Sequence, residues 1–403
     1  MRGPCSGSSR GALCWTALVI VGVAGAASPS RGTVRLVPEE YPTIQEAIDQ
    51  SAAGDTVLLS PGVYRGAGNR DIEFRGRDII LTSVAGAEET IIDCEHAGRG
   101  FNLHERETPA ARVEGVTVQN GRATGGGGGG IVCGGSAPTI SRCWFLHNDA
   151  SGPGGGVYLM VFNGVMEECV IAGNTLSISS WGGGLAFDHG GGIVRKCVIT
   201  GNWGYDGGGV GFGGTAANAL TGCTIAGNLG THGGGIRAWN NPLQLENCIV
   251  WDNCAFLDGQ EISTARAFFR CCAIDSADVD IWVSAEYDED CIFTDPLFCD
   301  PYVCGCTLEG DWSLDASSPC LPEHSPCGEL IGALGRGCGV VTPVGACCFP
   351  GGNCTVLAQQ SCEAQGGLYI GDGTDCEPNP CPGTAVEMPT WGAMKALFRE
   401  PAK

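Results

Sequence analysis

The sequence predicts an all-β protein built as a single-stranded solenoid of parallel strands, and two repeated patterns support this prediction. The first pattern is a cysteine, an apolar residue two positions later and an asparagine five positions later. It occurs at 143–148, 169–174, 197–202, 223–228 and 248–253. The second is a glycine triplet followed by an apolar residue, at Ile131, Val157, Leu185, Val210 and Ile236. Both recur every 25 to 28 residues, and two elements locked in one period indicate stacked coils.

The residues of each repeat have the chemistry of short strands. After the glycine triplet, apolar side chains alternate, as in Val157-Tyr158-Leu159, so the first and third should point inward and the second outward. Cys169 and Ile171 should likewise point inward together. Glycine and asparagine suit the corners because they tolerate positive φ. A degenerate earlier copy is predicted in Gly115-Val-Thr-Val-Gln-Asn120.

Two interior ladders follow from this stacking. We expect the recurring asparagines to stack, each amide bonding along the ladder and to the corner backbone; they are Asn148, Asn174, Asn202, Asn228 and Asn253. A second ladder consists of Cys143, Cys169, Cys197, Cys223 and Cys248. Neighbouring cysteines would lie within disulfide distance, but parallel side-chain vectors make the bond geometry poor. Buried thiols are therefore preferred over disulfide pairs, and both are preferred over a metal site.

The first 26 residues are predicted to be a cleaved signal peptide. Arg2 and Arg10 precede an apolar stretch at 11–25, and Ala24-Gly25-Ala26 supplies the small residues of a cleavage site. The alternative is a short membrane anchor, but the stretch is short for a bilayer span of about 20 residues. No later segment is long and apolar enough, so no transmembrane span is expected after signal cleavage. The mature chain should be secreted or displayed at the cell surface.

A short helix is predicted near residue 44. Thr43 and Glu46 form a candidate capping box, and Ile44, Ala47 and Ile48 share one face. The run from Val37-Pro38 through this segment to Pro61-Gly62-Val-Tyr64 resembles the start of pectin-lyase-like β-helix proteins. In that superfamily the segment is a capping helix followed by the first strand.

The repeats carry a second resemblance. Phe145-x-x-Asn148 and Ile171-x-x-Asn174, with Gly154-Gly-Gly-Val157 between them, are similar to the repeats of polymorphic outer-membrane adhesins. Together the two resemblances cover roughly residues 35–300 and imply a right-handed parallel β-helix, which with its caps is expected to span residues 33–338. They are specific for the fold and do not define a function.

Beyond residue 256 the period decays, and residues up to 338 are expected to form closing coils and a cap. A linker follows at 339–344. Residues 345–381 are predicted to form a module held by three disulfides among Cys347, Cys348, Cys354, Cys362, Cys376 and Cys381, with the connectivity open. Metal binding by this module is disfavoured because it lacks histidine and Cys-x-x-Cys spacing. Residues 382–403 are a basic and aromatic tail, either a sorting signal or a frayed helix.

Charge limits the classes of partner. The chain has 44 acidic residues against 22 Lys and Arg, a formal net charge of −22. This charge repels nucleic acid and anionic lipid, so neither is an expected partner. No cofactor is predicted; Ca²⁺ is a candidate ion because acidic proteins attract it.

Outward residues of the glycine-triplet strands supply the candidate ligand-binding positions, which are Tyr158, Asp188, Arg237 and Trp239. Between them Gly211 and Gly213 should form a shallow dip. An aromatic wall beside a carboxylate and a guanidinium could hold a sugar ring.

Asp188, His189 and Arg237 are the candidate catalytic residues, with His189 as acid or base near neutral pH. Phe187-Asp188-His189-Gly190 resembles an Asp-His segment of pectate lyases and a His-Gly motif of polygalacturonases. The rest of those families' patterns is missing, including an adjacent Asp pair. Arg195 and Lys196 lie nearby and are interpreted as solvated charge.

Two functional classes therefore remain. The preferred one is a structural or interaction scaffold, adhesin-like or glycan-binding, whose partner is an extracellular polysaccharide or a surface protein. The alternative is a polysaccharide lyase or glycoside hydrolase acting on extracellular glycans.

Overall fold

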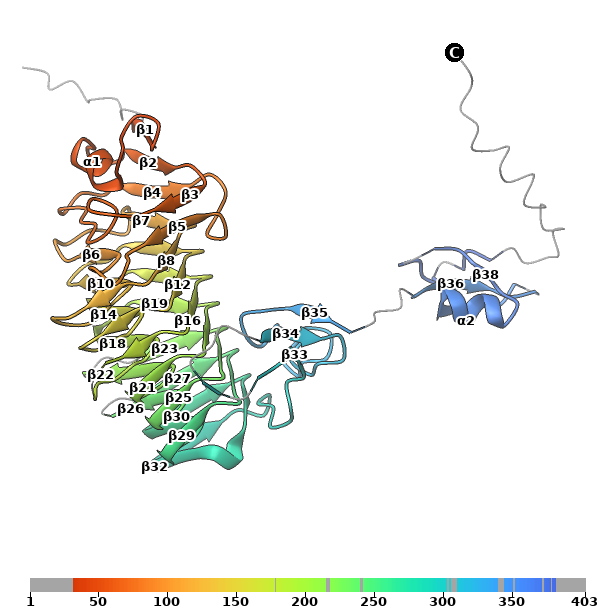
Figure 1. The fold of residues 1–403 in the computed structure, drawn as a ribbon. Helices are drawn as coiled ribbons and strands as arrows, with labels where there is room; N and C mark the ends of the chain where they lie inside the picture. Colours follow the sequence, from red (N-terminus) through yellow and green to blue (C-terminus); the bar gives the residue numbers. More distant parts are fainter. Residues whose placement is uncertain are drawn as a thin grey trace, which may run out of the picture.

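The structure is a computed structural model. It describes residues 32–381 apart from 178, 215–217, 240–241, 303, 306–309, 340–343, 351, 372 and 378. The predicted signal peptide and C-terminal tail lie outside the described residues. The chain winds into a solenoid of parallel strands (Figure 1). The predicted parallel β-helix is confirmed.

Three sheets of parallel strands run along the solenoid. A central coil contributes β14 (Val157–Phe162) and β15 (Val165–Glu167) to sheet 1, β16 (Val170–Ala172) to sheet 2 and β17 (Thr175–Leu176) to sheet 3.

The other strands of sheet 1 are β1 (Val34–Val37), β2 (Thr56–Leu59), β4 (Ile80–Ser83), β6 (Phe101–Leu103), β7 (Arg112–Glu114), β10 (Ile131–Gly134), β11 (Thr139–Ser141), β18 (Leu185–Gly190), β19 (Ile193–Arg195), β22 (Val210–Gly213), β23 (Asn218–Thr221), β26 (Ile236–Ala238), β27 (Leu243–Glu246), β30 (Ile262–Arg270) and β32 (Val279–Tyr287). Those of sheet 2 are β3 (Gly62–Tyr64), β5 (Thr90–Asp93), β8 (Thr117–Gln119), β12 (Trp144–Leu146), β20 (Val198–Thr200), β24 (Thr224–Ala226), β28 (Ile249–Trp251) and β31 (Ala273–Ile274). Those of sheet 3 are β9 (Arg122–Ala123), β13 (Asp149–Ala150), β21 (Trp203–Asp206), β25 (Leu229–His232) and β29 (Cys254–Asp258).

The amino-terminal end is covered by α1 (Ile44–Asp49). Thr43 Oγ1 accepts a hydrogen bond from the Glu46 N–H at 3.3 Å, which satisfies one of the free donors of the first turn. Ile44, Ala47 and Ile48 are fully buried and belong to the main core cluster, which also contains the inward residues of the coils. An amphipathic helix of this kind shields the first coil from solvent.

The asparagine ladder is continuous through five coils and is completely buried or nearly so. Asn174 is typical: its N–H and its Nδ2 both donate to Oδ1 of Asn202, each at 2.9 Å, and Nδ2 also donates to the Phe145 carbonyl at 2.9 Å. The ladder ends at Glu261, whose carboxyl oxygens accept from the Asn253 N–H at 3.0 Å and from Asn253 Nδ2 at 2.6 Å. Each buried amide thus has partners for its donors and its acceptor.

Two details of the predicted repeat are wrong. Positive φ falls on the residue before each ladder asparagine, such as Gly173 or Asp252, with φ of 64° and 57°, and not on the asparagine itself. Because Gln119 pairs with Leu146, Gly121 and not Asn120 occupies the ladder position, and its N–H donates to Asn148 Oδ1 at 2.8 Å. The ladder asparagines are therefore placed by hydrogen bonding, which a positive-φ argument does not capture.

The five ladder cysteines are free thiols and all are buried. Cys197 Sγ, for example, lies 3.3 Å from the Arg195 carbonyl oxygen. Cys272, which also is free and buried, follows Cys248 as the next member. Among the described residues, no cluster of His, Cys, Asp and Glu side chains is arranged to hold a metal ion.

The carboxyl-terminal region is held by disulfides. Cys254–Cys304, Cys271–Cys327 and Cys299–Cys338 tie residues up to 338 to the last coils and to each other. In the cysteine-rich module the pairs are Cys347–Cys362, Cys348–Cys381 and Cys354–Cys376. This module contains β36 (Val344–Cys348), β37 (Cys354–Ala358), α2 (Gln359–Ala364) and β38 (Leu368–Tyr369). Disulfides persist in oxidising compartments, which favours a location outside the cytoplasm.

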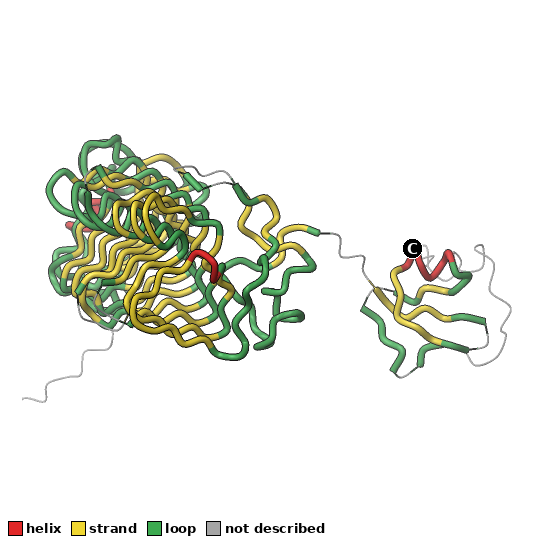
Figure 2. The backbone as a smooth tube through the Cα atoms, turned by 90° about the horizontal axis from the view of Figure 1, so that it is seen from below, coloured by secondary structure: helices red, strands yellow, loops and turns green. Residues whose placement is uncertain are grey.

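The expected closing cap lies in a different place. The small sheet of β33 (Phe298–Asp300), β34 (Asp311–Asp315) and β35 (Arg336–Cys338) sits beside the solenoid and not across its last coil (Figures 1 and 2). Trp312, Leu314 and Ile331 of this region form a second core cluster with Ile249 and Ala273 of sheet 2. The cap therefore covers a flank of the last coils. In the part of the chain that is described, no helix is long and apolar enough to cross a membrane.

Candidate ligand-binding face

The outer face of sheet 1 carries the residues singled out from the sequence. The register places Tyr158, Ala186, Gly211, Arg237 and Ser263 in one outward column. Val157 and Leu159 on either side of Tyr158 are fully buried, so the predicted alternation between interior and exterior holds. We use the name aromatic stripe for the ring side chains along this face, which are Tyr158, Trp181, Trp239 and Trp282.

Trp181 fills the dip expected over Gly211 and Gly213. A Cβ built on Gly213 would lie 2.9 Å from Cη2 of Trp181, and one on Gly211 would lie 2.5 Å from the Gly182 nitrogen. The glycines are therefore needed for Trp181 to lie against the strand. Its ring makes edge contacts with Tyr158 and with Trp239, both at 6.0 Å between centroids. Trp181 was not among the residues predicted for this face; the signal was the 28-residue spacing from Cys169 to Cys197, the longest of the set.

Asp188 and His189 lie at one side of Trp181. Asp188 Oδ1 is 2.6 Å from Nδ1 of His189, and Oδ2 accepts a hydrogen bond from the Tyr158 hydroxyl at 3.3 Å. Burial, followed by the charge of Asp188, raises the pKa of Tyr158 to about 12. The Tyr158 hydroxyl consequently stays protonated and fixes one carboxylate oxygen, while His189 fixes the other.

The Arg237 side chain is buried between neighbouring groups and does not form an exposed part of the aromatic stripe. It is only 9% exposed, and Nη1 donates to the Ser263 hydroxyl. Its guanidinium lies 4.6 Å from the ring centroid of Trp282 and 5.8 Å from that of Trp239, a cation–π arrangement. The predicted proximity of Arg237 to Trp239 is present, but the cation faces these rings and has little surface left for a ligand.

A second set of polar side chains, from sheet 3, lies close to the Arg237 guanidinium. Asp206, His232 and Asp258 form a column across β21, β25 and β29. His232 Nδ1 lies 2.9 Å from Asp258 Oδ1, and Arg237 is 3.8 Å from Asp206 and 3.5 Å from Asp258. Burial raises the pKa of Asp206, with Arg237 acting in the opposite direction. The repeats gave no indication of this column because the turns leading into sheet 3 vary in sequence.

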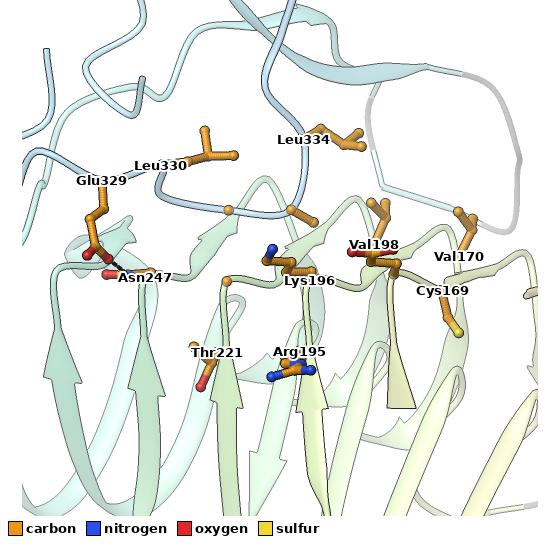
Figure 3. A pocket seen from close by; sticks show the side chains of 14 residues that line it. Cys169, Val170, Arg195, Lys196, Val198, Thr221, Asn247, Glu329, Leu330 and Leu334 are labelled. Carbon is orange, nitrogen blue, oxygen red and sulfur yellow. Dashed lines mark hydrogen bonds between the residues drawn. The ribbon is translucent and has the colours of Figure 1, made fainter. Parts of the chain in front are cut away.

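A cavity of about 670 Å³ lies on another face, between sheet 2 and residues 329–334 (Figure 3). Val170, Val198, Leu330 and Leu334 supply apolar lining, and Lys196 lies between them. Arg195, interpreted from sequence as solvated, donates from Nε to Glu167 at 2.8 Å. Glu329 accepts from Asn247 Nδ2 at 2.7 Å and holds one end of the segment against the coils.

One of three comparisons with known proteins bears on the fold, the match to a family model. Residues 111–274 match the family model for the right handed beta helix region. A solved structure titled "Crystal structure of pectate lyase Pel9A" is similar at a TM-score of 0.38 and 12% identity, covering 73% of this chain and 91% of that chain. A search of curated proteins found no match. The family match over residues 111–274 and the parallel register of the strands agree with the parallel β-helix predicted from the sequence.

Proposed function

We propose that the protein is a secreted or cell-surface β-helix scaffold that binds an extracellular polysaccharide on the aromatic stripe. The observation that carries this proposal is the contact series Tyr158–Trp181–Trp239, with 6.0 Å between successive ring centroids. Large rings with an apolar face and a polar edge suit the C–H faces of sugars. Tyr158 stands on β14, Trp181 forms an isolated bridge to Asp206 of β21, and Trp239 directly follows β26.

Polar groups flank the rings on both sides. Asp188 and His189 lie beside Tyr158, and Asp206, His232 and Asp258 lie beside Arg237. Carboxylates and imidazoles can orient sugar hydroxyls, as the few polar groups of a ligand site do. The net charge of −22 favours a neutral polysaccharide over a polyuronate, unless Ca²⁺ bridges the two.

The test is binding of the secreted full-length product to neutral xylan, mannan and β-glucan and to a polyuronate, each with and without Ca²⁺. Trp181→Ala combined with Trp239→Ala should weaken binding to the preferred glycan at least tenfold. Trp144→Ala is the matched control, because Trp144 is a partly exposed tryptophan on sheet 2. Full affinity of the double variant, or an equal loss in Trp144→Ala, would contradict the proposal.

A second candidate function is glycan cleavage, and the pKa shift of Asp206 favours it. Asp206 and Asp258 flank His232 in register, so they are two coil steps apart, on the order of 10 Å. Inverting glycosidases place their two carboxyl groups about 6.5–9.5 Å apart, one of them with a raised pKa. New reducing ends that disappear in Asp206→Asn would support hydrolysis. Unsaturated ends that disappear in Asp188→Ala or Arg237→Ala would support a lyase.

A further inference from the structure

At the carboxyl-terminal end of the solenoid, the last strand of sheet 1 has one edge that is not paired with another described strand. β32, the last strand of sheet 1, pairs with β30 on one side, and no other described strand pairs with it. It lies at the end of the stack (Figure 1). At the opposite end α1 covers the first coil. A free edge presents a row of backbone donors and acceptors that another strand can pair with.

The backbone groups that face outward can be identified. In a parallel pair, the N–H and C=O of alternate residues point to the same neighbour. The Asp288 N–H donates to the Phe269 carbonyl of β30 at 3.1 Å, and the Glu261 N–H donates to the Asp278 carbonyl at 3.1 Å. Even-numbered residues of this segment therefore bond to the solenoid. The N–H and C=O groups of Ala285 and Tyr287 point away from it.

At this end of the solenoid, residues in the inward columns are exposed because no further described coil covers them. Val279, Ala285 and Tyr287 pair in register with Ile262, Ala267 and Phe269, which are buried, yet Ala285 and Tyr287 are exposed themselves. Val283 at the bulge is 62% exposed. A further strand with apolar residues at alternate positions would continue the inward columns and cover them.

The acidic charge around β32 determines which kind of partner strand would pair with it favourably. Seven of the sixteen residues at 275–290 are acidic, and none is Lys, Arg or His. The edge strand also lacks proline and lysine, the residues that commonly block edge pairing. A second copy of this end would bring like charges together, which disfavours self-pairing. A basic strand would meet opposite charge.

We propose that the free edge of β32 binds an extended segment of a partner protein, with alternating apolar and basic residues, as an added β-strand. The main chain supplies the hydrogen bonds and the apolar positions continue the core, as in other cases of strand addition. The basic residues lie beside Asp280 and Glu286 on the outer face. This inference is independent of glycan binding, because it needs neither Trp181 nor Trp239.

The probe is a synthetic nine-residue peptide of alternating valine and lysine, and the control peptide has the same sequence with alternate amides N-methylated. Binding to the full chain is measured by fluorescence anisotropy, and amide hydrogen exchange is followed at Ala285 and Tyr287. We expect binding of the unmodified peptide, at least tenfold weaker binding of the methylated one, and slower exchange at both amides.

Protein variants separate pairing from attraction by charge alone. Ala285→Pro removes an outward N–H without removing a bond to β30, and should weaken binding at least tenfold. Ala285→Val keeps that N–H and should bind within twofold of the parent. Equal binding of the two peptides would overturn the proposal, as would the absence of binding. A dimer seen by sedimentation and dissolved by Ala285→Pro would also overturn it, in favour of a second copy as the occupant.

Discussion

The interior columns of the solenoid and its outer face follow different rules. Inside, one asparagine and one cysteine recur at the same place in five successive coils, all buried. Outside, a single column reads Tyr158, Ala186, Gly211, Arg237 and Ser263, with no residue repeated. The repeated asparagines hold the coils together, because each bonds to a neighbouring copy. The unrepeated positions are free to differ, and the candidate ligand-binding residues are found among them.

Replacing an interior asparagine should have the largest effect on stability. Asn202→Ala removes the acceptor for the Asn174 N–H and Nδ2 and the donor to the Ile171 carbonyl. Several buried groups left without partners, at about 1–3 kcal/mol each, should lower the free energy of unfolding by about 4 kcal/mol or more. Denaturant titration measures this. Asn102→Ala, which removes one bond to Glu73 at a partly exposed site, is the control and should cost under about 1 kcal/mol. Equal losses would remove the distinction between the two kinds of position.

The end of the asparagine ladder should make stability depend on pH. Burial raises the pKa of Glu261 to about 8, above its ordinary value, so the folded chain holds this proton more tightly than the unfolded chain. Stability from this group is complete below about pH 4.5 and is lost as pH rises toward and through 8, by a few kcal/mol in all. Glu261→Gln should flatten the pH profile of the unfolding midpoint between pH 5 and 9. An unchanged slope would show that other groups control it.

A cysteine of the ladder should matter less than an asparagine. Cys197→Ala removes one buried sulfur and leaves a small cavity, for an expected loss of about 1–2 kcal/mol. Thiol titration of the parent should find the ladder cysteines unreactive in the native chain and reactive after denaturation without reductant. If they are already oxidised, the ladder consists of disulfide pairs and our interpretation of free thiols is wrong.

The smallest effect on stability is expected on the outer face. Trp181→Ala removes a partly exposed ring that makes edge contacts with two other rings, and each such contact is worth about 1 kcal/mol. Glycan binding should fall much more than stability does. A loss of stability as large as that of Asn202→Ala would mean that the stripe is a structural element.

The sequence predicted the interior well because a period of 25 to 28 residues fixes which side chains stack. For the same reason it placed Tyr158 and Asp188 at outward positions of sheet 1. Trp181 was missed because it lies in an insertion before the glycine triplet, outside the repeat. The burial of Arg237 depends on Trp282 and Ser263, which belong to coils where the period has already decayed. Asp206, His232 and Asp258 come together because of the strand pairing in sheet 3, and the repeated sequence patterns do not extend to these strands.

The asparagine column also makes the length of this protein adjustable in whole units. Each ladder asparagine before Asn253 bonds to the next copy and to a backbone carbonyl of the preceding coil, and neither group depends on the side chains of a particular coil. Deletion of residues 170–197 would join Cys169 to Val198 and place Asn202 directly after Asn148 in the column, with the same donors and acceptors facing each other. Trp181 and Asp188 would be lost with that coil. Related proteins could therefore gain or lose a binding surface through one in-frame duplication or deletion. The hydrogen bonds of the asparagine ladder would stay continuous through such a change.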